Sequence, residues 1–70
     1  MEYKDYRSQF GLSLAPEGAT VKIAYLAGCR FMIVWIDCPD LENVLYANLP
    51  SRKVANEIVN GHNWRLKTDH

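Results

Sequence analysis

Six apolar residues, Phe31 to Ile36, follow one another without interruption in the middle of the chain. Two of them, Ile33 and Val34, are β-branched and favour an extended backbone. Because a strand directs alternate side chains to opposite faces, the odd-numbered residues would line one face and the even-numbered residues the other. Both faces of this predicted strand are therefore apolar, and both need cover.

Shorter stretches in which apolar and polar residues alternate predict further strands beside the central one. The predicted strands are about 10–14, 19–27, 30–37 and 43–48. Pro16 and Gly18 are typical of a β-turn, which would join the first two strands into a hairpin. Strict alternation in the last strand would place Val44 and Tyr46 on one face and Leu45 on the other.

After residue 49 the apolar spacing becomes helical, with Val54 and Ile58 on one stripe. Pro50 suits a first helical turn, and Gly61 follows the last one, so a helix is predicted over about 50–60. The chain is thus predicted to be a single α+β domain, residues 1–70. It would form an antiparallel meander sheet of three to four strands, with this helix on one face.

Both ends of the chain leave alternatives open. Tyr3, Tyr6 and Phe10 have helical spacing, which would give the element order α-β-β-β-α. At the other end, in the tail His62–His70, Trp64 and Leu66 alternate with basic residues. This tail is predicted either to add an edge strand or to pack across the end of the helix.

Charge and length argue against several classes of protein. Eight basic residues balance eight acidic ones, whereas a dedicated nucleic-acid binder carries a clear positive excess. The apolar run is far shorter than the roughly 20 residues that span a bilayer, and the charged start is unlike a signal peptide. We therefore expect a cytoplasmic protein without membrane contact. Cys29 and Cys38 flank the central strand, roughly 30 Å apart, and are predicted to be free thiols.

Catalysis and metal binding find little support in the sequence. The candidate nucleophiles and bases are Cys29, Cys38, His62 and His70, and no motif surrounds them. There is no Cys-x-x-Cys pair, and the glycines are isolated from one another. We predict that the protein is not an enzyme and uses no cofactor or metal.

Two charged groups have a functional and a plain interpretation. Asp37, Asp40 and Glu42 would form an acidic loop that receives a cation from a partner, or simply a solvated turn. Arg52 and Lys53 start the predicted helix, where cations oppose the helix dipole. With Arg65 and Lys67 they would bind phosphate or carboxylate, or they only keep the helix start soluble. Residues 49–70 hold four basic and two acidic residues, so the molecule is polarised.

The two-faced strand is the strongest functional signal. One helix covers one face, and the other needs a partner protein, a second copy of the chain, or its own ends around Tyr3, Tyr6, Trp64 and Leu66. We predict a non-catalytic protein-binding module, a small inhibitor or modulator of the phage- or plasmid-accessory type. It would occupy a surface on a larger protein, such as a nucleic-acid-processing complex, with a homodimer as another way to cover the face.

The alternative is a small nucleic-acid-binding protein that uses the helix start and the basic tail. The predicted contact residues are Trp35, Tyr46, Arg52, Lys53, Trp64 and Arg65.

Overall fold

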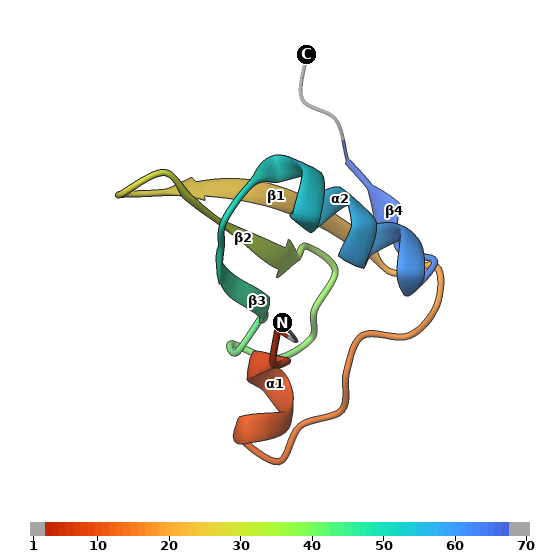
Figure 1. Ribbon diagram of the computed structural model, residues 1–70. Coiled ribbons are helices and arrows are strands. Elements are labelled where there is room, and N and C mark those ends of the chain that lie inside the picture. Colours follow the sequence, from red (N-terminus) through yellow and green to blue (C-terminus); the bar gives the residue numbers. More distant parts are fainter. Residues whose placement is uncertain (1–2, 68–70) are drawn as a thin grey trace.

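The computed structural model describes residues 3–67 and has an α+β fold, as predicted (Figure 1). The elements are α1 (Tyr6–Gln9), β1 (Thr20–Leu26), β2 (Arg30–Trp35), β3 (Val44–Leu49), α2 (Arg52–Gly61) and β4 (Arg65–Leu66). The sheet has the strand order β3-β2-β1-β4. β2 pairs antiparallel with both β1 and β3, but β4 pairs parallel with β1, so the sheet is mixed and not the predicted antiparallel meander.

The N-terminal region differs most from the prediction. No strand forms at 10–14, and the hairpin predicted from 10–14 and 19–27 is wrong, because β4 and β2 occupy the two edges of β1. Asp5 instead starts the short helix α1, since its carboxylate accepts hydrogen bonds from the N–H groups of Arg7 and Ser8. The chain then turns at Gly11, whose φ of 74° suits glycine. This local capping outweighs three alternating apolar residues, of which Phe10 is 60% exposed.

The predicted strands at 19–27 and 30–37 are confirmed as β1 and β2, with a tight connection between them. Val21 lies opposite Trp35, and the pairing continues without a shift to Leu26 and Arg30. Gly28 and Cys29 both have positive φ in the turn, which allows the chain to reverse within three residues.

β3 does not alternate strictly, because it contains two irregularities opposite β2. Ile33 lies opposite Tyr46 but the next residue, Val34, lies opposite Val44, so Leu45 is an extra residue. A second shift follows, near Asn48, which has a φ of 59°. As a result Leu45 and Tyr46, predicted to face opposite ways, are both buried in one core cluster.

α2 confirms the helix predicted at about 50–60, with its start two residues later. The Ser51 hydroxyl caps the helix by accepting a hydrogen bond from the Val54 N–H. Ala55 and Val59 are its buried residues, and α2 lies across one face of the sheet (Figure 1). In residues 3–67 no helix has the length and apolar character needed to cross a membrane.

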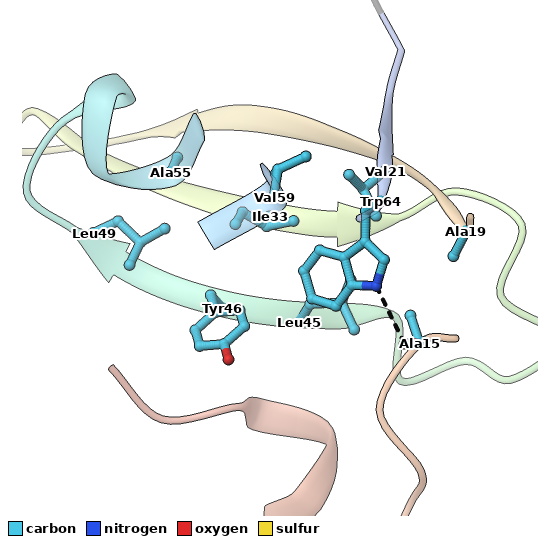
Figure 2. Close-up of a cluster of buried hydrophobic side chains, with 10 residues drawn as sticks. All are labelled: Ala15, Ala19, Val21, Ile33, Leu45, Tyr46, Leu49, Ala55, Val59 and Trp64. Atoms are coloured by element: carbon cyan, nitrogen blue, oxygen red, sulfur yellow. Dashed lines mark hydrogen bonds between the residues drawn. The ribbon is translucent and has the colours of Figure 1, made fainter. Parts of the chain in front are cut away.

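The core lies between α2 and the sheet, and segments from both ends of the chain complete it (Figure 2). The Trp64 indole N–H donates a hydrogen bond of 3.2 Å to the carbonyl of Ala15. The Gly18 N–H donates to the carbonyl of Asn63 at 3.0 Å. The tail predicted as an edge strand is therefore present as β4, and it is held against the segment that precedes β1.

Candidate functional site

The pairing of the strands defines two faces of the sheet. We call the side that packs against α2, with Val21, Ile33 and Tyr46, the covered face. The side chains that alternate with these form the open face. Its apolar members are Ala24, Leu26, Met32, Val34, Ile36 and Val44. Its other members are Thr20, Lys22, Arg30 and Arg65.

The segments that complete the core cluster lie on the covered face. None of the apolar side chains of the open face belongs to the core cluster, whereas Tyr3, Leu14 and Trp64 from the two ends of the chain all pack in or against it. On the open face Val34 is the most buried, at 9% exposed, and Ile36 is 36% exposed. Of the residues that were expected to fold over the second face of β2, Tyr3 and Trp64 instead add to the cover of the first face. Leu66 pairs with Val21, on the covered side as well.

All the charged residues that the pairing places on the open face are cations. Lys22 lies opposite Val34 in the sheet, and Arg30 lies opposite Leu26 beside the hairpin turn. Arg65 pairs with Thr20 at the other edge, and it follows the buried Trp64, so it points away from the core. The paired residues of the four strands put no Asp or Glu on this face, and the exposed Asp37 and Glu42 lie in the loop that joins its Ile36 to Val44.

The acidic loop receives its cation from within the chain. The guanidinium of Arg7, 4% exposed, donates hydrogen bonds of 2.6 Å to the carbonyls of Ser13 and Glu42. It also forms an ion pair of 3.1 Å with the carboxylate of Asp40 and lies 5.0 Å from the ring centre of Trp35. Arg7 thus binds the N-terminal segment to the loop after β2, and we call this set of contacts the Arg7 anchor. Sequence reasoning missed it, because one arginine after a helix cap carries no pattern.

Two of the predicted contact residues, Tyr46 and Trp64, are core residues at 8% and 5% exposed. The Tyr46 hydroxyl lies 3.2 Å from Nε2 of His62, and the His62 ring stacks on Trp64 with the ring centres 4.2 Å apart. Burial raises the pKa of Tyr46, and the negative charge of Asp5 raises it further. Trp35 is half-buried against the core, so these three aromatic residues all belong to the covered face.

The structure does not bring the predicted basic residues together. The guanidinium of Arg52 lies 5.2 Å from the ring centre of Phe31, which explains a cation in the first turn of α2. Lys53 is exposed on the same helix. Arg65 belongs to the open face, on the other side of the sheet from α2.

The thiols and histidines show no catalytic arrangement in the described chain. Cys29 and Cys38 are both free, and neither is hydrogen-bonded to His62 in residues 3–67. Cys38 accepts hydrogen bonds from Arg7 at 3.1 Å and from the Asp40 N–H at 3.4 Å, as part of the Arg7 anchor. His70 lies outside the described residues.

Comparisons with protein-family models, curated protein sequences and solved structures found no match to this chain. Of the surfaces described above, the open face alone combines a continuous set of apolar side chains with charges of a single sign.

Proposed function

We propose that this chain is a non-catalytic protein-binding module, a small inhibitor or modulator that docks on a larger protein through the open face of its sheet. The observation that supports the proposal is that the apolar side chains of the open face lie outside the core cluster, with Ile36 the most exposed of them at 36%. Contiguous apolar surface of this kind marks interaction sites in small soluble proteins.

The proposal moves the contact surface away from the aromatic residues of the covered face. Tyr46 and Trp64 stabilise the core. Truncating either side chain would destabilise the fold, so such a variant could not test a partner contact separately. Met32 and Val34 in the middle of the open face, with Lys22 and Arg30 beside them, take the place of those residues as proposed contacts.

Site-specific crosslinking tests the proposal. A photo-crosslinking amino acid at Met32, on the open face, is expected to give one discrete adduct with a larger protein in lysate from the source cells. The same group at Glu57, exposed on α2 on the other side of the sheet, serves as the control and is expected to give none. Equal labelling from both positions, or no adduct from Met32, would contradict the proposal.

If an adduct forms, the purified target is assayed with and without the chain. The module is expected to change the activity of the target, and Met32→Lys is expected to remove this effect. A target whose activity does not respond to the chain would contradict the role as inhibitor or modulator.

A further inference from the structure

We infer that the partner of the open face is an acidic amphipathic segment of another protein, with apolar side chains flanked by Asp or Glu. This inference rests on the proposed function and specifies the chemistry of its partner. The starting observation is that Lys22, Arg30 and Arg65 lie on this face, while the paired strand residues put no acidic side chain there.

Three acidic residues lie away from this face, and Asp37 and Glu42 lie in the loop beside its edge. Asp40 pairs with the buried Arg7, and Asp5 caps α1. Glu57 is exposed on α2, on the other side of the sheet. A neutral chain thus has a cationic binding face, and its field would attract carboxylates during the encounter with a partner.

The arrangement of the cations suits a segment that is both apolar and acidic. Lys22 sits beside Val34, near the centre of the face, and Arg30 and Arg65 lie near the hairpin turn and on β4. Toward β3 the face continues with Val44, which is apolar. A partner with an apolar stripe on Val34 and Val44, and with carboxylates along the side toward β1, would match both properties.

A second copy of the chain fits this face less well. Two open faces in contact would each contribute Lys22, Arg30 and Arg65 and no described carboxylate. Like charges brought together in an interface oppose association. We therefore expect a monomer in solution, and light scattering after size exclusion checks this directly.

A single-stranded nucleic acid also fits less well, because its bases bind sheet surfaces by stacking on aromatic side chains. The aromatic residues of β1, β2 and β3 are Tyr25, Phe31, Trp35 and Tyr46, and the register places all of them on the covered side. Among the described strand residues, the open face offers cations without a stacking platform.

Selection from a random peptide library on the immobilised full chain tests the inference. Enriched peptides are expected to combine apolar residues with an excess of Asp and Glu. They should bind at least about tenfold more weakly to the variant Lys22→Glu/Arg30→Glu, in which attraction becomes repulsion. Lys4→Glu/Lys53→Glu changes the net charge equally at exposed positions outside the sheet and is expected to alter affinity less than about twofold.

The outcomes separate the two proposals. Peptides that lose binding to Met32→Lys but show no acidic excess would overturn the inference and leave the protein-binding function standing. If no peptide depends on Met32, the open face is not a binding surface, and both proposals fail. Tight binding of a labelled DNA duplex that requires Lys22 and Arg30, without acidic peptides, would assign the cations to phosphate and overturn the inference.

A reversed selection gives the sharpest result. On the Lys22→Glu/Arg30→Glu variant the enriched peptides are expected to change from acidic to basic. A thermal melt that matches the wild-type protein would show that the exchange has preserved the fold. Enrichment of the same acidic peptides on both proteins would contradict a role for the cations.

Discussion

The two faces of the sheet are built from the same strands and are similarly apolar, yet they differ in cover and in charge. The covered face holds Ile33 and Leu45, fully buried beneath α2 and segments from both chain ends. The open face holds Met32 and Val34 on the same β2, with cations as its charged residues. Apolar content therefore does not decide which face becomes the core. The difference lies in which face the ends of the chain can reach.

The largest expected effect comes from truncating Ile33 on the covered side of β2, and its neighbour Met32 on the open face serves for comparison. Ile33→Ala is expected to lower the free energy of unfolding by about 2–5 kcal/mol, because it leaves a cavity in the core. Met32→Ala, one residue away on the open face, should cost less than about 1 kcal/mol, since its side chain is only partly buried. Urea denaturation measures both.

If Ile33→Ala fails to fold, Ile33→Val keeps the comparison measurable, with an expected loss of about 1 kcal/mol. Equal losses for Ile33→Ala and Met32→Ala would mean that both faces are packed. The distinction between a covered and an open face would then be wrong.

Removing the Arg7 anchor should have the next largest effect. Arg7→Met leaves the carbonyls of Ser13 and Glu42 without their donor and is expected to cost about 3 kcal/mol. Asp40→Asn weakens only the ion pair between Arg7 and the Asp40 carboxylate. Because the Asp40 side chain is 48% exposed, this change should cost less than about 1 kcal/mol. A similar loss in both variants would show that the ion pair, and not the carbonyl bonds, stabilises this region.

A smaller loss is expected from weakening the helix that forms the cover. Ser51→Ala removes the acceptor for the Val54 N–H and should lower the free energy of unfolding by about 1 kcal/mol. Ser51→Asp, which retains a capping oxygen, serves as the control and should stay near the wild-type stability. Thermal unfolding of the three proteins measures the effect, and an unchanged midpoint for Ser51→Ala would exclude this cap as a source of stability.

The smallest effect concerns pH. Burial raises the pKa of Tyr46 above its usual value of 10.0, so the folded chain holds this proton more tightly than the unfolded chain. The resulting stability is fully present below pH 10 and is lost as the pH rises through the higher pKa of the folded state. Tyr46→Phe is expected to reduce this alkaline loss, whereas Tyr25→Phe, at an exposed position, should not. Urea denaturation between pH 8 and about 11 tests this difference.

The sequence pattern predicted those elements that depend only on residues close together in the chain. The alternation in β1 and β2, the turn at Gly28 and the helical stripe of α2 all follow from neighbouring residues. The tail also alternates, and it forms β4. Its parallel pairing with β1 could not be predicted, because it depends on the path of the chain around α2.

The open face could be predicted only in part. The excess of apolar surface on β2 was visible in the sequence, as was the need for a second cover. The choice of face was not visible, because the extra residue Leu45 in β3 and the contacts of Arg7 act between distant parts of the chain. The cation set was missed for the same reason, since Lys22 and Arg65 come together only when β4 joins β1.

The position of Trp64 in the core has a consequence for biosynthesis. This indole packs with residues of β1, β2 and β3 and reaches back to Ala15, 49 positions earlier in the chain. Until residue 64 has left the ribosome, the covered face of the nascent sheet lacks the indole that completes its core cluster. The core can therefore close only after residue 64 has emerged, and chaperones that recognise exposed strands can bind the chain before that moment.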